Sequence, residues 1–391
     1  MPTLRLADRA LALRPSPTLQ ITALANSLRA QGEDVLSFAA GEPDFNTPEP
    51  ICEAAIDAIR RGVTKYTPSA GMPKLRQAIA DKLIRENRLP ATAEQVIVSC
   101  GAKHSLYNTM QVLLNPGDEV LLIAPYWMTY AEQVRLAGGV PIVVPTDAAA
   151  DFIPAADAIR ERITSRTRMI VINSPSNPSG AVYPRAVLKE IAALALRHDL
   201  WIVSDEIYER LIYGVETESI AALSADVAAR TITVGGVAKT YSMTGWRIGF
   251  AYAPAPVATA MSHFQDQVTS NPTSFAQVGA IAAYEMDSAA VEAMRSTFEA
   301  RRDLIVARLN AIPGVSVRAP RGAFYVLPDF SAFLGGDDAA LALRLMHDAK
   351  IAAIPGHVFE APGHLRFSYA TDSETIARGM DRLAEILPAL Q

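Results

Sequence analysis

Lys239 and Arg247 lie in one loop of the chain, and both residue types can take part in chemistry. Between and around them the sequence V-G-G-V-A-K-T-Y-S-M-T-G-W-R offers glycine, hydroxyl and apolar residues. Most lysines are solvated surface charges. A lysine that is buried near another cation has a lowered pKa instead, and its neutral amine can form a Schiff base with a carbonyl. Arg247 could supply that cation, or hold a phosphate as a planar fork.

Two upstream segments favour the chemical interpretation of the lysine. Asp205 and Tyr208 follow an apolar run that starts at Trp201, and Asn177 follows another that starts at Ile170. Buried parallel strands bring the residues after their carboxyl ends to one edge of a sheet, where α/β proteins bind ligands. A carboxylate, a phenol, an amide, an amine and a guanidinium at one edge suit a pyridine-based cofactor with an aldehyde and a phosphate.

With these residues the sequence resembles the pyridoxal-phosphate-dependent class I aminotransferases, in the bacterial and plastid-like branch of the aspartate aminotransferase family. The resemblance extends from F-A-A-G-E-P-D-F at Phe38 to H-L-R-F-S-Y-A-T at His364, with the motifs in the family's order. It implies the α/β fold of the fold-type I pyridoxal-phosphate transferases. In that fold a large domain with a mostly parallel, doubly wound sheet is joined to a smaller α/β domain.

The resemblance implies a role for each residue at the sheet edge. Lys239 would carry pyridoxal 5′-phosphate and act as the catalytic base. Asp205 would keep the pyridine nitrogen protonated, so that the ring can accept electrons. Asn177 and Tyr208 would hold the ring oxygen, and Arg247 would bind the phosphate. We therefore expect Lys239, Asp205 and Tyr208 to be the catalytic residues.

Further cofactor contacts are implied by three other motifs. Trp127, in P-Y-W-M-T-Y, would stack on the pyridine ring. Gly101, Ala102 and Lys103 form a turn between a predicted strand and a predicted helix, where amide N–H groups and the helix dipole favour an anion such as phosphate. Tyr66 would reach across a homodimer to the phosphate of the partner's cofactor, so the active sites would be shared between subunits.

The substrate contacts are also implied by the resemblance. Arg366 would grip the α-carboxylate as a bidentate fork, beside the backbone of Gly41. Asn177 and Trp127 would border the substrate. Lys103 would help to hold the second carboxylate of an acidic amino acid. No metal ligand is expected.

Each of these residues also has a plainer structural interpretation. Arg366 could be an exposed strand charge, and Tyr66 or Trp127 could serve packing alone. Lys103 could merely neutralise the cofactor phosphate. A lysine is a mobile point charge, so Lys103 should select acidic side chains less sharply than an arginine would.

The sequence departs from the family pattern at three points. Gly236 stands where some relatives have a serine that touches the phosphate. His104 stands where most relatives have glutamine, and we interpret it as a hydrogen-bonding residue behind the site and not as a base. No arginine occurs between Gly249 and Met294, the region where animal-type enzymes keep a clamp for the second carboxylate.

The expected reaction is transfer of the amino group of aspartate or glutamate to a 2-oxo acid, such as 2-oxoglutarate or oxaloacetate, by a ping-pong mechanism. Alternatives are an aromatic or a glutamate/aspartate–prephenate aminotransferase, or a pyridoxal-phosphate-dependent lyase on the same fold. A non-catalytic pyridoxal-phosphate binding module is a further alternative. The sequence has neither a G-x-G-x-x-G turn nor a P-loop, which argues against a nicotinamide enzyme.

Composition narrows the class of protein. Hydrophobic residues make up 50% and charged residues 20% of the 391 residues, and the net charge is −5. There is no basic tract for nucleic acid, and no apolar run approaches the about 18 residues that a membrane span needs. The two cysteines provide no disulfide framework. We therefore expect a cytoplasmic protein with neither nucleic-acid nor membrane partners.

Alternating strand and helix patterns must position these residues, as in a doubly wound sheet. We expect an N-terminal arm and part of the small domain over residues 1–46, a large cofactor-binding domain over 47–290 and a small C-terminal domain over 291–391. The two prolines within residues 14–18 predict an extended arm. Thr47 is the predicted N-cap of a helix whose apolar face carries Ile51, Ala55, Ile56 and Ile59.

Overall fold

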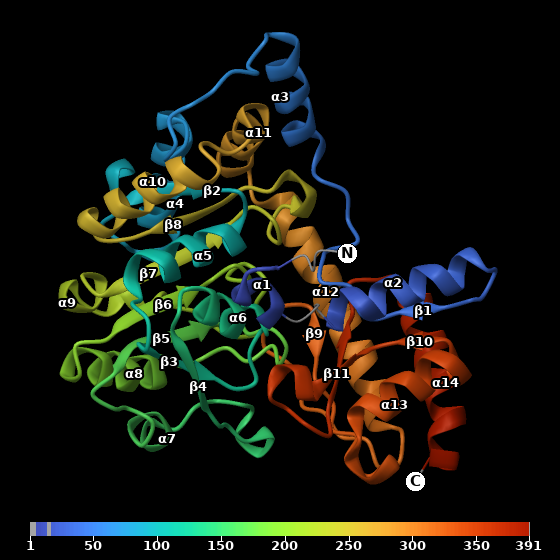
Figure 1. Ribbon diagram of the computed structural model, residues 1–391. Coiled ribbons are helices and arrows are strands. Elements are labelled where there is room, and N and C mark those ends of the chain that lie inside the picture. Colours follow the sequence, from blue (N-terminus) through green and yellow to red (C-terminus); the bar gives the residue numbers. More distant parts are fainter. Residues whose placement is uncertain (1–4, 14–16, 391) are drawn as a thin grey trace.

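A seven-stranded sheet is the centre of the computed structural model, which describes residues 5–13 and 17–390 (Figure 1). Within these residues the strand order is β2-β8-β7-β6-β5-β3-β4. Strand β8 runs antiparallel to both of its neighbours, and the other pairs are parallel. The strands are β2 Val96–Ser99, β3 Glu119–Ile123, β4 Val140–Val144, β5 Thr167–Asn173, β6 Trp201–Asp205, β7 Thr231–Gly236 and β8 Gly249–Tyr252.

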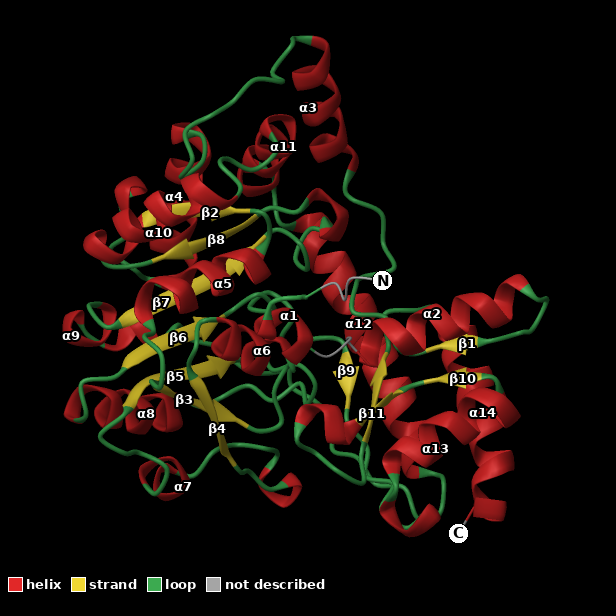
Figure 2. Ribbon diagram, viewed as in Figure 1, coloured by secondary structure: helices red, strands yellow, loops and turns green. Residues whose placement is uncertain are grey.

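Both faces of this sheet are covered by helices (Figure 2). Along β3, Val120 and Leu122 pack into one core, and Leu121 and Ile123 pack into the core on the opposite face. One face is covered by α5 Ala102–Leu113, α6 Thr129–Leu136 and α10 Ala255–Val268. The other is covered by α4 Pro73–Asn87, α7 Ala156–Arg160, α8 Arg185–Arg197, α9 Ala225–Ala228 and α11 Ser274–Glu285, with α3 Glu49–Arg60 packed on α11. Strands buried on both faces read as continuous apolar runs. The predicted doubly wound, mostly parallel sheet is confirmed.

A second group of elements forms around smaller sheets at the C-terminal end of the chain, with residues from the N-terminal part (Figure 1). Its elements are α2 Pro17–Ala30, β1 Leu36–Ser37, α12 Ala289–Asn310, β9 Tyr325–Val326, α13 Asp338–Arg344, β10 Ile351–Ala352, β11 Ile354–Pro355, β12 Leu365–Ser368 and α14 Ser373–Ile386. A short helix, α1 Asp8–Ala12, precedes them in the chain. Strand β1 pairs with β10, and β12 lies between β11 and β9. No helix in the described part of the chain is both long and apolar enough to cross a membrane.

One hydrophobic core joins the two groups. It contains Tyr208, which follows β6, together with Phe298 on α12 and Phe324 next to β9. The rings of Phe298 and Phe324 stack at 5.4 Å between centroids. The division of the chain at residues 46 and 290 into an arm, a large domain and a small domain stays a prediction.

Two local predictions were wrong, namely the N-cap of α3 and an extended chain at residues 17–18. Pro48, not Thr47, occupies the N-cap position of α3, and the Thr47 hydroxyl instead donates to the carbonyl of Ser242. On α3 the side chains of Ile56 and Ile59 are 38% and 49% exposed, although Ile51 is fully buried. Residues 14–16 of the predicted extended arm lie outside the described residues, and residues 17–18 begin α2. A proline fits the first turn of a helix, which explains that difference.

A partly buried ion pair ties the segment after β1 to α12. The Arg301 guanidinium, 9% exposed, donates to both carboxylate oxygens of Asp44, at 2.7 and 2.9 Å. It also stands 5.2 Å from the ring centre of Phe45 and 5.8 Å from that of Phe298. Because Gly41 lies three residues before Asp44, this pair anchors the segment that enters the candidate site.

We expect Asp44→Asn to destabilise the protein by about 2–3 kcal/mol, because it leaves a buried guanidinium without its counter-charge. The urea unfolding midpoint would measure the change. Asp381→Asn is the matched control, because its partner Arg308 is 44% exposed and Asp381 is 59% exposed. An exposed pair is worth less than about 1 kcal/mol. Equal losses in the two variants would contradict the anchoring role.

Candidate active site

The end of β6 places a buried carboxylate at the edge of the large sheet. Asp205 is 2% exposed and accepts hydrogen bonds from the Tyr130 hydroxyl at 2.7 Å and from the Ile207 amide at 3.2 Å. Burial raises the pKa of Asp205 to about 6, and the hydrogen bond from Tyr130 and the charge of Lys239 oppose that rise. Asn173, at the end of the neighbouring strand, donates to the Asp205 carbonyl at 2.9 Å.

Lys239 follows β7 and points toward the same edge. Its amine donates to the carbonyl oxygen of Gly41 and stands 6.0 Å from the Tyr208 ring centre and 5.7 Å from that of Phe324. The Tyr208 hydroxyl shares a 3.0 Å hydrogen bond with the hydroxyl of Tyr325. The amine therefore lies between the turn after β6 and the segment after β1.

The surroundings of Lys239 favour its neutral form. The side chain retains some exposure, yet protein atoms surround the amine closely. Burial lowers the pKa of Lys239 to about 8; Arg366 and Arg247 lower it further, and Glu42 and Asp205 act in the opposite direction. An amine with this pKa is partly unprotonated near neutral pH, so it can act as a nucleophile or as a base.

Arg366 lies on β12 and is buried, with no counter-charge in the described part of the chain. It is 2% exposed, and it donates to the Asn177 side-chain oxygen and to the Ala39 carbonyl, each at 3.0 Å. Its Nε atom has no partner, and no carboxylate pairs with it among residues 5–13 and 17–390. Its guanidinium carbon stands 4.5 Å from the Tyr325 ring centre and 5.2 Å from that of Phe359. A buried cation held only by neutral acceptors is suited to bind a carboxylate that enters from outside.

A second part of the site is an anion cradle at the start of α5. Gly101 has φ of 88°, and a Cβ atom there would lie 2.5 Å from Nη2 of Arg247. That guanidinium donates to the carbonyls of Thr244 at 2.9 Å and Cys100 at 3.3 Å. The amides of Ala102 and Lys103 donate to no acceptor in the described part of the chain. Free amides at a helix N-terminus beside an arginine form an anion site.

Lys103 and Trp127 lie next to this cradle. The Lys103 amine stands 4.6 Å over the Trp127 ring, and burial together with Arg247 lowers the pKa of Lys103. The Trp127 ring meets Tyr130 edge-on, with 5.6 Å between the ring centroids. Because Tyr130 also donates to Asp205, the aromatic pair links the cradle to the sheet edge.

Two of the three departures from the family pattern, at Gly236 and His104, have local explanations. A Cβ atom on Gly236 would lie 2.9 Å from the Cα atom of Gly249, because β7 and β8 approach closely here, so a serine would not fit without a shift. His104 accepts a hydrogen bond from the Cys100 amide at its Nδ1 atom, at 3.3 Å. Burial lowers the pKa of His104, and its Nε2 atom has no partner among the described residues. A neutral histidine that holds the turn from behind agrees with our interpretation.

The structure brings all but one of the predicted site residues together. Tyr66 is the exception, because its side chain is 93% exposed and makes no hydrogen bond or ring contact in the described residues of this chain. Three contributors were missed from sequence: Tyr325, Tyr130 and Asn173. Asn173 ends an apolar strand immediately before the recognised turn, which is a signal that could have revealed it. Nothing local distinguishes the two tyrosines from core aromatics. The functional roles of all these residues stay predictions.

The sequence and the fold both match known proteins. The family model for "aminotransferase class I and II" matches residues 33–383. An aspartate aminotransferase of Bacillus sp. strain YM-2 is 48% identical over 385 residues, which cover 97% of this chain and 98% of the relative. An aspartate/prephenate aminotransferase of Thermus thermophilus is 45% identical, with 98% of each chain covered.

Solved structures agree with these matches. The aspartate aminotransferase of T. thermophilus with maleate superposes with a TM-score of 0.95 at 44% identity, over 98% of this chain and 100% of that one. The aspartate aminotransferase of Rhizobium meliloti superposes with a TM-score of 0.96 at 38% identity, over the full length of both chains. A family model that covers most of the sequence and relatives that align from end to end lead to one assignment. This chain belongs to the class I and II aminotransferase family.

Proposed function

We propose that this protein is a pyridoxal-phosphate-dependent aminotransferase that moves the amino group of aspartate or glutamate to a 2-oxo acid. The observation that carries the proposal is the juxtaposition of Lys239, whose pKa is lowered to about 8, with the buried and unpaired Arg366. The first provides an amine that can react near neutral pH, and the second a cation that can bind the α-carboxylate. A homodimer and a cytoplasmic location are part of the proposal, and both cysteines are free.

The residues present fit pyridoxal phosphate. The cradle of Gly101, Ala102, Lys103 and Arg247 has unpaired amides and a guanidinium for a phosphate. Asp205 would hold the pyridine nitrogen at the other end. When bound, the cofactor supplies an aldehyde for an amine and a ring that accepts electrons from the substrate carbon.

The remaining residues would position the cofactor and the substrate. Tyr208 and Asn177 would hold the ring oxygen, and Trp127 would cover one face of the ring. Arg366 and the Gly41 backbone would orient the amino acid, because a fork that grips the α-carboxylate fixes the direction of the Cα–H bond.

Lys239 would hold and move the proton at the substrate Cα. Its amine is near enough to the Gly41 segment to reach a substrate bound by Arg366. A base placed beside the carbon needs no diffusional encounter. Its pKa near 8 lets it both take and return a proton near neutral pH.

Lys103 is our proposed contact for the second carboxylate of the substrate. It lies over Trp127 beside the cradle, and the T. thermophilus relative was solved with maleate, a dicarboxylate. A second candidate function is an aspartate/prephenate aminotransferase, which the names of relatives favour. A lyase on the same fold would use the same Lys239 and Asp205, but it would release eliminated products without a keto-acid acceptor.

The function is tested by adding single amino acids to the purified holoenzyme and following the visible absorption of its cofactor. We expect aspartate and glutamate to change the spectrum fastest, and a 2-oxo acid to restore it. Lys239→Ala should lower the rate by many orders of magnitude, because the reactive amine and the base are lost together. Eliminated products without restoration by a 2-oxo acid would indicate the lyase.

Substrate choice gives a separate prediction at Lys103. In Lys103→Ala we expect kcat/KM for aspartate to fall by a factor that corresponds to about 1–3 kcal/mol of lost transition-state stabilisation, as for a lost charged hydrogen bond. With alanine as donor, kcat/KM should be unaffected. Steady-state kinetics with both donors provide the comparison. If both fall equally, Lys103 serves the phosphate and the acidic preference loses its support.

The Lys239 pKa predicts a pH profile for the cofactor-free protein. Acetylation of this amine should rise through a midpoint of about pH 8, because only the unprotonated amine reacts and it predominates above that pH. Unperturbed lysines have a pKa of about 10.4. Peptide mass spectrometry after brief acetylation at a series of pH values would follow Lys239 and the surface lysines in one experiment. A Lys239 profile that coincides with the surface lysines would contradict the lowered pKa.

The proposed homodimer predicts complementation between subunits. Exposed Tyr66 and the exposed face of α3 with Ile56 and Ile59 are available to a second copy. Tyr66→Ala should weaken cofactor binding, and Lys239→Ala is inactive. In an equal mixture refolded together, about one quarter of the sites would have an intact Lys239 and an intact partner tyrosine. Activity at limiting cofactor should then exceed that of either variant alone. No gain from mixing would argue against shared sites.

A further inference from the structure

The turn that follows β6 presents different side chains on its two sides. Asp205 and Tyr208 face the candidate active site. Glu206 and Glu209 lie on the side of α4. The Glu209 amide donates to the Glu206 carbonyl at 2.9 Å, so the turn is tight. The members of each pair are three residues apart, and each pair lies on its own side of the turn.

The last two turns of α4 hold the second pair. Lys82, only 3% exposed, forms an ion pair with Glu209 and donates to the Asn87 side-chain oxygen at 2.7 Å. The Asn87 amide group donates to Glu209 at 2.7 Å and to Glu206 at 3.2 Å. Asn87 of α4 therefore contacts both carboxyl groups, and Lys82 contacts that of Glu209.

Glu206 is enclosed on its other sides. It is 6% exposed, and one of its oxygens accepts from the hydroxyls of Ser204 at 2.8 Å and Ser219 at 2.7 Å. Burial and the neighbouring charge of Glu209 raise the pKa of Glu206 to about 7. Near neutral pH the two carboxyl groups therefore carry less than two negative charges beside Lys82.

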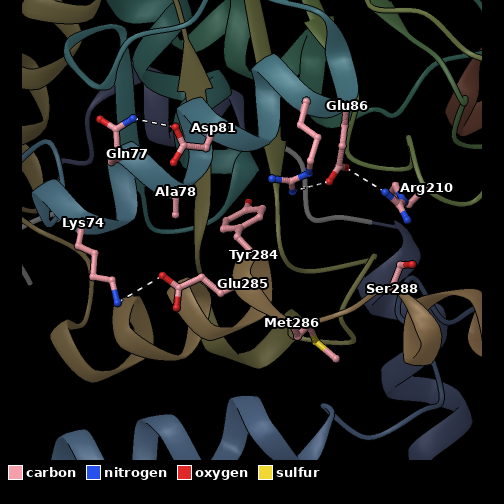
Figure 3. Close-up of a pocket in the computed structure, with 11 residues that line it drawn as sticks. Lys74, Gln77, Ala78, Asp81, Glu86, Arg210, Tyr284, Glu285, Met286 and Ser288 are labelled. Carbon is pink, nitrogen blue, oxygen red and sulfur yellow. Dashed lines mark hydrogen bonds and ion pairs between the residues drawn. The ribbon is translucent and has the colours of Figure 1, made fainter.

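The next residue of the turn is tied to the same helix at the surface. Arg210 donates to Glu86 of α4 at 3.0 Å, at the rim of a cleft of about 740 Å³ between α4, α11 and the start of α12 (Figure 3). Figure 3 shows Glu86 directed toward Arg210, while Lys74 and Asp81 of the same helix have other partners. Three residues of the turn are thus bonded to three residues of α4.

This network is not explained by stability alone. Buried charges lose hydration, and apolar side chains of similar volume stabilise a core as well or better. What hydrogen-bonded charges add is direction, because each bond fixes a distance and an angle. The turn that they fix carries Asp205 and Tyr208, and a misplacement of about 1 Å at a reacting group can cost about a hundredfold in rate.

We propose that Lys82 and Asn87 of α4 are positioning residues, which hold Glu206 and Glu209 and thereby set the placement of Asp205 and Tyr208. The inference rests on the proposed function, because it assigns the network a part in that reaction. No member of the network is required to contact substrate or cofactor. Its effect passes through the backbone of residues 205–209.

The test compares Lys82→Met, Glu209→Gln and the double variant with the wild-type holoenzyme. With aspartate, Lys82→Met should lower kcat by about 10- to 100-fold. KM should change less than about twofold, because Arg366 is untouched. The pH midpoint of the visible absorption of the bound cofactor should also shift. The double variant removes both charges of the pair, so it should recover part of each effect.

A readout without cofactor separates this inference from the proposed function. In the cofactor-free protein, Lys82→Met should lower the hydrogen-exchange protection of the amides of Glu206, Glu209 and Leu211, which donate within or next to the turn. Amides of α14 provide the internal reference. If the wild type shows no transamination, the proposed function fails, and the exchange result still decides whether α4 orders the turn.

Lys74→Met is the matched control, because it is the same substitution on the same helix in an exposed ion pair with Glu285. It should leave kcat, the absorption midpoint and the exchange rates unchanged. The proposal is overturned if Lys82→Met lowers only the melting temperature and otherwise matches this control. If Lys82→Met does not fold, Glu209→Gln and the double variant, which leave no unpaired Glu209 charge, decide by the same measurements.

Discussion

A buried cation with no counter-charge among the described residues is the constraint on which the rest of the site depends. Arg366 is 2% exposed and is held by the neutral oxygens of Asn177 and Ala39. Burying a charge in this way is costly unless the surrounding structure holds it firmly. The low local dielectric that makes it costly also strengthens its attraction for an entering carboxylate. The same surroundings lower the pKa of Lys239 and raise that of Asp205. One buried environment therefore tunes the charge of Lys239 and Asp205 and the carboxylate affinity of Arg366.

The two halves of the site come from different sheets, and packing sets their separation. Asp205 ends strand β6 of the large, mostly parallel sheet, whereas Arg366 lies in the small antiparallel one. The shared core that includes Tyr208, Phe298 and Phe324 lies between them. Close-packed aromatic rings have few alternative arrangements, so this core resists small shifts. The ion pair between Arg301 and Asp44 and the network on α4 hold the two flanks of the same region.

Much of the fold was predictable from sequence, because strands buried on both faces must be continuously apolar and must end in polar turns. That rule placed Asp205 and Asn177 at one sheet edge, and a family resemblance added Arg366 from a distant segment. The Gly101 turn was also readable, because a strand, a glycine and a helix in succession form an anion site. The strand-end residues and the Gly101 turn are local features of the chain. They depend on hydrophobic periodicity and on backbone geometry, which a sequence states directly.

Tertiary structure alone decided which aromatic residues belong to the site. Tyr325 and Tyr130 meet Tyr208 and Asp205 through contacts that span 117 and 75 residues of sequence, and nothing beside them in the chain marks those partners. The exposure of Tyr66 is likewise a property of the folded surface. Hydrophobic pattern reports that a side chain is buried, but not what it is buried against. Hydrogen-bond partners and pKa values depend on distances between remote segments, and only the packed chain sets those distances.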